Sequence, residues 1–263
     1  MNILFIGDIV GRVGRRMIKD YLNIYVEKYH IDFVIANGEN ATHGKGLIQN
    51  HYNELINNGV DVITLGNHYK SKNEILRYLD FADNLIRPYN ILEKCPGVGT
   101  AIFDVDGISV RVTNILGAAF MNEQVNAPYY SILEILADEE KANIHIIDFH
   151  AEATGEKQSF AYALDGKVTA VLGTHTHVQT RDYMVLPQGT GFISDVGMTG
   201  YYDGVLGFTK ETVVAKNMYG ELKKFEVPDD GRGLLSAVVL HVDDLSGKCL
   251  EIFPIYYVED KEK

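Results

Sequence analysis

The chain has 263 residues, of which 46% are hydrophobic and 23% are charged, a balance typical of a folded globular protein and not of a disordered one. Its net charge of −12 disfavours a general surface for long DNA, because that polyanion would be repelled. No apolar run approaches the roughly 18 residues of a membrane-spanning helix, so we expect no membrane partner.

Cysteine usage and the first residues indicate a reducing compartment. Cys95 and Cys249 are the two cysteines of the chain, too few for a disulfide framework or a zinc ribbon. Met1 leads into a short apolar run that Asp8 interrupts, which is not the pattern of a secretion signal. We therefore expect a cytoplasmic protein. The scattered prolines and the lack of repeats predict a single domain over residues 1–263.

The N-terminal part of the chain alternates strand-like and helical patterns. A short apolar run predicts a buried strand at 3–7, and apolar side chains at helical spacing predict a helix over 13–25. Further strands are predicted at 32–36 and 61–65, with a helix over 47–56 between them. This order of elements is typical of a largely parallel sheet.

The pattern changes after residue 100. Asp106-Gly107 suits a two-residue type I′ turn, so the flanking segments are predicted to form a hairpin. We expect a layered α/β fold of the α+β kind, with two packed sheets and flanking helices. The remaining predicted elements are a helix over 127–141 and strands at 143–149, 169–173, 183–186, 191–194, 234–242 and 249–256.

Each strong apolar run ends in side chains that are able to bind a metal ion. In open α/β sheets, ligands gather at the carboxyl ends of the strands, so five such ends would bring these side chains to one rim. The segments at these ends are Gly7-Asp8, Asn37-Gly38-Glu39-Asn40, Gly66-Asn67-His68, Asp148-Phe149-His150 and Gly173-Thr174-His175-Thr176-His177.

Each segment alone also has a structural explanation. Asp8 would serve as a helix N-cap, Asn67-His68 as a turn, and His150 as a hydrogen-bonded histidine at a strand end. The pair His175 and His177 is more specific, because residues i and i+2 of an extended segment point to the same side. Five unrelated caps would not all offer Asp, Glu, Asn or His, so the joint pattern favours a metal site.

The candidate ligands are too many for one tetrahedral zinc ion but about right for two metal ions with a bridging carboxylate. They offer oxygen and imidazole and no thiolate, which suits iron or manganese best, and zinc as well. The seven residues are Asp8, Glu39, Asn40, Asn67, His150, His175 and His177.

These motifs resemble those of the calcineurin-like metallophosphoesterases, and more closely those of their YmdB branch. Supporting stretches are residues 38–46, 148–154, 175–180 and 195–200. The resemblance implies a four-layer α/β/β/α sandwich with the site at the strand ends. It implies that Asp8 and His177 hold one metal ion and that Glu39 bridges both. The second ion would be held by Asn40, Asn67, His150 and His175.

The resemblance also implies the reaction, which is hydrolysis of a phosphodiester by a metal-bridged hydroxide with His68 as the proton donor. The implied substrates are 2′,3′-cyclic nucleotides, opened at the 2′ side. His43 lies in the glycine-rich loop after Glu39 and is a candidate contact for the substrate. A small phosphodiester is the expected partner, while RNA ends and self-association stay open.

Two departures from the family pattern bear on function. Val10 replaces a histidine that most metallophosphoesterases carry, a loss that the YmdB branch shares. Tyr69-Lys70-Ser71 stands where the branch usually has Thr-Trp-Asp, which leaves the substrate preference open. Two alternatives therefore remain: a phosphomonoesterase or protein phosphatase with the same centre, and a non-catalytic regulator that binds a nucleotide or an RNA end.

Overall fold

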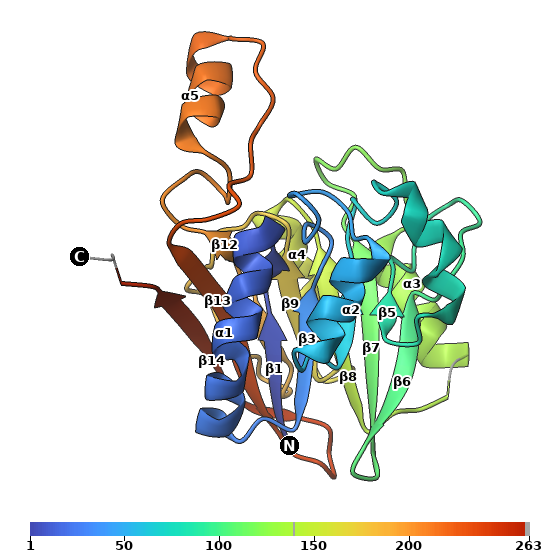
Figure 1. Cartoon of the computed structure of the whole chain (residues 1–263). Coiled ribbons are helices and arrows are strands. Elements are labelled where there is room, and N and C mark those ends of the chain that lie inside the picture. The colour runs from blue at the N-terminus through green and yellow to red at the C-terminus, as the bar shows by residue number, and fades with distance from the viewer. Residues whose placement is uncertain (139, 261–263) are drawn as a thin grey trace.

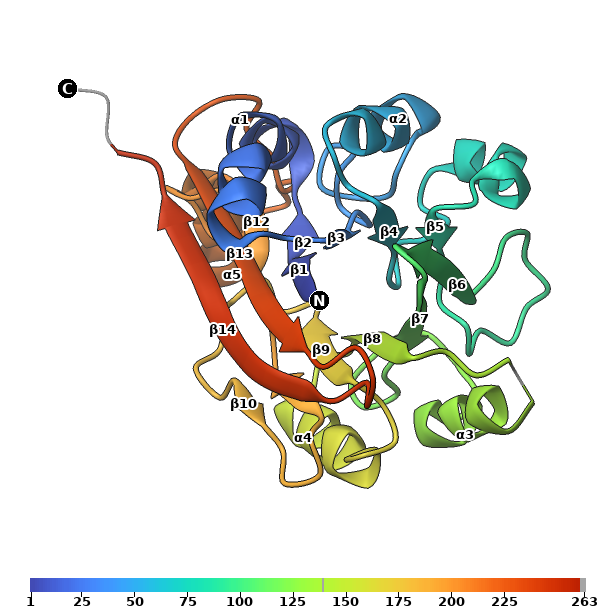
Figure 2. The same ribbon diagram turned by 90° about the horizontal axis from the view of Figure 1, so that it is seen from below.

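Two β-sheets packed face to face form the body of the protein (Figures 1 and 2). The computed structural model describes residues 1–138 and 140–260, and within them the two sheets have eight and six strands. The first sheet contains, in spatial order, β2 (Asp8–Ile9), β12 (Met198–Tyr201), β13 (Gly233–Val242), β1 (Asn2–Ile6), β3 (Phe33–Asn37), β4 (Val62–Thr64) and β5 (Leu85–Ile86), with β14 (Cys249–Val258) paired to β13. The second contains β10 (Met184–Val185), β11 (Gly191–Ile193), β9 (Ala170–Thr174), β8 (Ile144–His150), β7 (Ile108–Leu116) and β6 (Thr100–Val105).

Helices cover the outer face of each sheet (Figure 2). The first sheet is covered by α1 (Gly11–Tyr29) and α2 (Gln49–Asn57), and the second by α3 (Pro128–Asp138) and α4 (Thr154–Ala163). Two 3-10 turns, η1 (Asn73–Arg77) and η2 (Leu79–Phe81), follow β4. The helix α5 (Lys210–Tyr219) stands away from the body (Figure 1). The predicted four-layer α/β/β/α sandwich is therefore confirmed.

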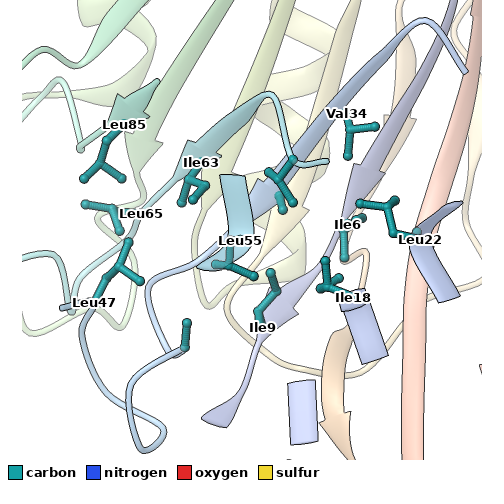
Figure 3. Close-up of a cluster of buried hydrophobic side chains, with 14 of the residues drawn as sticks. Ile6, Ile9, Ile18, Leu22, Val34, Leu47, Leu55, Ile63, Leu65 and Leu85 are labelled. Carbon is teal, nitrogen blue, oxygen red and sulfur yellow. The ribbon is translucent and has the colours of Figure 1, made fainter. Parts of the chain in front are cut away.

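Three layers of buried apolar side chains hold the four layers together. On β1, Leu4 and Ile6 point to the outer cluster beneath α1 and α2, part of which Figure 3 draws. Ile3 and Phe5 alternate with them and point to the cluster between the two sheets. A strand that is buried on both faces must be apolar at every position, which explains the continuous run at the start of the chain.

Parallel pairing brings several strand ends to one edge of the body. In the first sheet β1, β3, β4 and β5 are parallel neighbours. In the second sheet β7, β8, β9 and β11 are parallel neighbours. The carboxyl ends of β1, β3, β4, β8 and β9 carry the predicted ligands, so this edge is where both sheets place them.

The remaining predictions agree with the structure in most places. Asp106 and Gly107 have φ values of 51° and 85°, as a type I′ hairpin turn between β6 and β7 requires. The helix predicted over 127–141 ends at Asp138; residue 139 lies outside the described residues, and residues 140–141 are not helical. The helices α4 and α5 were not predicted. The single domain over 1–263 stays a prediction. Among the described residues, no helix combines the length and apolarity needed to cross a bilayer.

The cluster between the sheets should dominate stability. We expect Ile146→Ala, at a fully buried position of β8, to lower the free energy of unfolding by about 2–5 kcal/mol, because it leaves a cavity between the sheets. Ile24→Ala is a matched control, since Ile24 is 55% exposed on α1, and should change it by less than about 0.5 kcal/mol. Urea unfolding measures both; equal costs would contradict this account of the core.

Candidate metal centre

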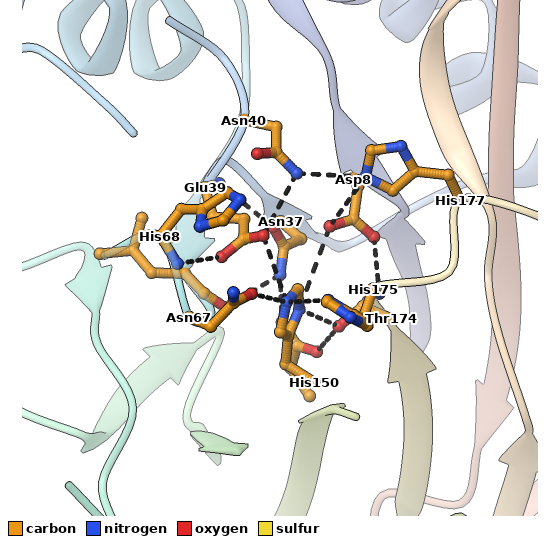
Figure 4. Close-up of polar contacts among 12 residues, drawn as sticks. Asp8, Asn37, Glu39, Asn40, Asn67, His68, His150, Thr174, His175 and His177 are labelled. Carbon is orange, nitrogen blue, oxygen red and sulfur yellow. Dashed lines mark hydrogen bonds and ion pairs between the residues drawn. The ribbon is translucent and has the colours of Figure 1, made fainter. Parts of the chain in front are cut away.

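The structure brings the seven predicted ligands together at the edge where the strand ends meet (Figure 4). They arrive from both sheets, so the two-layer packing itself assembles the cluster. One carboxylate oxygen of Glu39 and one ring nitrogen each of His150 and His175 all lie within 4.8 Å of one another. The predicted ligand roles stay predictions, whereas the convergence of the side chains is an observation.

Two buried carboxylates supply the negative charge of the cluster. Asp8 is fully buried, and its Oδ2 accepts a hydrogen bond from the backbone N–H of His175 at 3.1 Å. Burial raises the pKa of Asp8, and His177 and His150 oppose that shift. Burial would also raise the pKa of Glu39, but the positive charge and hydrogen bond of His150 lower it to about 2. Both carboxylates therefore depend on cationic neighbours for their charged form.

A hydrogen-bond chain sets the orientation of His150. The Thr174 hydroxyl donates to Asp148 Oδ1 at 2.6 Å, so it has only a lone pair to offer to His150 Nδ1, 2.9 Å away. His150 Nδ1 is thereby the protonated nitrogen, and Nε2 faces Glu39 and Asn67 at 3.2 Å and 3.0 Å. Burial alone would lower the pKa of His150, but Glu39 and the other carboxylates raise it to about 9. The cluster thus attracts positive charge at Nε2.

The other two histidines are oriented in the same way. His175 Nε2 lies 3.1 Å from Glu152 Oε2, which leaves Nδ1 to face His150 Nε2, also at 3.1 Å. Burial lowers the pKa of His175 to about 3, so its imidazole is neutral, as ligation requires. His177 Nδ1 donates to the carbonyl of Leu206 at 3.0 Å, which leaves Nε2 free to face the cluster. Three ring nitrogens therefore face inward, and each would offer a lone pair to an ion once its ring is neutral.

The two amides contact different histidines of the cluster, and the implied grouping of the ligands stays a prediction. Asn67 Oδ1 lies 3.0 Å from His150 Nε2, as expected. Asn40, which the resemblance grouped with Asn67, instead has its amide nitrogen 3.1 Å from His177 Nε2. The reason is a backbone hydrogen bond at 3.0 Å from Gly11 N–H to the Asn40 carbonyl, which holds Asn40 against the turn that follows Asp8.

The two remaining candidates occupy different positions. The backbone N–H of His68 donates to Glu39 Oε2 at 2.8 Å, and its half-buried imidazole lies beside that carboxylate (Figure 4). Burial lowers the pKa of His68, although Glu39 opposes the shift. His43 is exposed, and its ring packs edge-on against His51 with the ring centroids 6.3 Å apart. A substrate contact for His43 stays a prediction.

A buried ion pair that the sequence did not reveal supports the histidine segment. Lys157 Nζ on α4 lies 2.8 Å from Asp195 Oδ2 and donates to the Thr174 carbonyl at 2.8 Å. The same Asp195 oxygen accepts the backbone N–H of Thr176 at 3.0 Å. The pair therefore holds the backbone on both sides of His175. Asp195 lies in one of the family-like stretches, but nothing in the pattern pointed to Lys157.

The donors fit a metal centre. Within the part of the chain that the structure describes, Asp8 Oδ1 and Asn40 Oδ1 are buried and have no hydrogen-bond partner. A buried oxygen of this kind is costly unless a cation or a donor satisfies it. Gly66 leaves open the space beside Glu39 and His150, because a Cβ atom there would lie 2.3 Å from Glu39 Oε2 and 2.5 Å from His150 Nε2. Oxygen and imidazole donors of this kind suit iron, manganese or zinc.

We expect Gly66→Ala to weaken metal binding by about 10–100-fold, because the added methyl group would push Glu39 and His150 apart. Metal analysis after equilibrium dialysis against manganese measures the effect. Gly155→Ala is the matched control, since a Cβ atom at Gly155 meets nothing within 4 Å. Undiminished manganese binding by Gly66→Ala would contradict the assignment of this space to an ion.

Comparisons with known proteins show the family of this chain. A family model described as YmdB-like protein matches residues 4–255. A Bacillus subtilis protein named 2′,3′-cyclic-nucleotide 2′-phosphodiesterase is 44% identical over 261 residues, covering 99% of this chain and 98% of the relative.

Two solved structures are similar over nearly the whole chain. One is a hypothetical protein from Thermus thermophilus, with a TM-score of 0.92 and 38% identity, covering 99% of this chain and all of the other. The second, described as a novel phosphatase from Mycoplasma pneumoniae, has a TM-score of 0.93 and 36% identity, covering 99% and 94%. With the family model matched over most of its length, the chain belongs to the YmdB-like family.

Proposed function

We propose that the protein is a metal-dependent phosphodiesterase that opens 2′,3′-cyclic nucleotides at the 2′ side. The observation that carries the proposal is the convergence of three inward-facing imidazole nitrogens and two buried carboxylates at one sheet edge. The name of the Bacillus subtilis relative supports the substrate class. The free thiols of Cys95 and Cys249 support a reducing compartment such as the cytoplasm.

The number and placement of the donor side chains fit two metal ions better than one. Asp8, Asn40 and His177 would hold the first ion. Asn67, His150 and His175 would hold the second. Glu39 lies between the groups, with Oε1 3.2 Å from both Asn40 Nδ2 and His150 Nε2, and would bind both ions. When bound, such ions lower the pKa of water and neutralise phosphate charge. Iron or manganese suits the donors best.

His68 supplies the proton for the leaving oxygen. Its backbone is fixed by the hydrogen bond to Glu39, so the imidazole stands at the rim of the centre. Burial keeps the pKa of His68 below its usual value in the free protein, and the negative charge of a bound diester raises it again. In its protonated form, His68 would transfer its proton to the alkoxide as the bond to phosphorus breaks.

We expect Glu39→Gln to lower the number of bound manganese ions from two to at most one. The change removes the charge that both groups of ligands share. Metal analysis and calorimetric titration with manganese count the ions, and Glu134→Gln, on the exposed side of α3, is the control. Two tightly held ions in Glu39→Gln would contradict the bridging role.

We expect His68→Ala to lower turnover of 2′,3′-cyclic nucleotides by at least about tenfold, because their alkoxide leaving group needs a proton. A nitrophenyl diester, whose leaving group is stable without a proton, should lose much less. Metal content should stay at two ions, since alanine keeps the backbone N–H that contacts Glu39. His241→Ala, at an exposed position, is the control. Equal losses on both substrates would refute the proton-donor role.

A phosphomonoesterase is the second candidate, because the Mycoplasma pneumoniae structure is described as a phosphatase. The same ligands could bind a monoester, whose second negative charge adds to the attraction of the ions. Rates on matched nucleoside monophosphates and cyclic nucleotides separate the two candidates. Faster hydrolysis of the monoesters would replace our proposal with this one.

A further inference from the structure

A cavity of about 290 Å³ adjoins the centre on the side of Asn67. Asn67 forms part of its wall, so a ligand in the cavity would touch a residue of the metal cluster. The other walls come from the segment after His68 and from two loops, and include Tyr69, Leu92, Glu123 and Val125. The size is at the lower end of small-molecule pockets, which suits one nucleoside and not an oligonucleotide.

The walls combine apolar contact with a few polar side chains. Ile91, Leu92 and Val125 present apolar surface, and Leu92 is 60% exposed. Flat aromatic rings such as nucleobases pack well on surface of this kind. The polar side chains of Tyr69 and Lys70 are directed to Glu93, which they both contact. Of the two polar side chains that remain, Gln124 and Glu123, Glu123 has a buried oxygen that no described residue satisfies.

One oxygen of Glu123 has no hydrogen-bond partner among the described residues. Oε1 lies 3.4 Å from the amide nitrogen of Asn67, and this contact turns Asn67 Oδ1 toward His150. Oε2 is buried and has no hydrogen-bond partner among the described residues. An acceptor left in this state costs free energy, and an N–H donor on a ligand would offset that cost once the Glu123 side chain turns this oxygen toward the cavity. Nucleobases carry such donors on their edges.

The direction of ring opening indicates which side of the centre the base occupies. In the proposed reaction water adds to phosphorus, the P–O2′ bond breaks, and the proton goes to O2′. The O2′ oxygen is attached to the carbon next to C1′, which carries the base, so the base lies on the side of the leaving oxygen. His68, the proton donor, follows Asn67 directly and precedes Tyr69, both of which line the cavity.

We propose that this cavity binds the nucleobase of the substrate, with Leu92 packing on the base and Glu123 accepting a hydrogen bond from it. The inference rests on the proposed function, because the placement follows from opening at the 2′ side. A wider cavity of about 800 Å³ on the His175 side, lined by Phe120, Glu152 and Val178, is the competing position. Phe120 is 88% exposed there and offers a stacking surface.

The test compares a 2′,3′-cyclic nucleotide with ethylene phosphate, a five-membered cyclic diester without a base. We expect Leu92→Ala to lower the ratio of their kcat/KM values about tenfold, because only the nucleotide uses the apolar wall. Leu245→Ala, at a 95% exposed leucine in the β13–β14 turn, should leave the ratio at the wild-type value. Phe120→Ala should also leave it unchanged, and a fall there with none in Leu92→Ala would overturn the proposal.

Glu123→Gln tests the hydrogen bond. Glutamine keeps an oxygen for Asn67 but presents a donor where the free acceptor stood, so we expect the same ratio to fall about tenfold. Calorimetry with manganese-loaded protein gives a readout without turnover. The dissociation constant of a nucleoside 3′-monophosphate should rise about tenfold relative to that of inorganic phosphate in both variants.

The outcomes separate this inference from the proposed function. Wild-type hydrolysis of nucleotides with unchanged ratios in Leu92→Ala and Glu123→Gln would overturn the base site and leave the reaction intact. Wild-type protein that binds the 3′-monophosphate through Leu92 and Glu123 but hydrolyses no diester would overturn the reaction and leave the base site. A fall in both ratios supports the site.

Discussion

The structure depends on the burial of two carboxylates, Asp8 and Glu39, where the ends of two sheets meet. Removing such charges from water costs several kcal/mol each unless opposite charge is supplied nearby. The chain supplies part of it through His150, whose pKa the carboxylates raise to about 9. The negative potential of the two carboxylates favours a proton on His150. The same potential would favour a metal cation at this place. The centre is therefore built to hold positive charge before any substrate arrives.

The orientation of the three histidines is set by hydrogen bonds to groups outside the cluster. Each inward-facing histidine donates its other ring N–H to an acceptor outside the cluster: the Thr174 hydroxyl, Glu152 or the Leu206 carbonyl. His175 and His177 have φ values of 100° and 65°, a conformation that bulky residues seldom adopt. The buried pair of Lys157 and Asp195 holds this strained backbone from behind. The contacts that α4 makes through Lys157 thus help to fix the orientation of the two histidines.

The sequence predicted what depends on strand periodicity and missed what depends on tertiary contact. The apolar run that ends at Asp8 indicated a buried strand with a site at its end. A strand that is buried on both faces carries polar residues only where it reaches the edge of the sheet. The helix α4 gave no apolar stripe, since its core-facing side carries the buried Lys157. The helix α5 exposes Met218 and Tyr219 and buries little, so its pattern was equally weak. The position of Asn40 was set by its long-range hydrogen bond to Gly11, which no local pattern encodes.

The segment Tyr69-Lys70-Ser71 after His68 differs from the usual family pattern but does not contribute to the polar cluster. The bond from the His68 backbone N–H to Glu39 does not depend on which side chains follow. Tyr69 and Lys70 both contact Glu93, and all three residues line the neighbouring cavity. Variation in this segment therefore alters the shape and charge of that cavity while the donors keep their places.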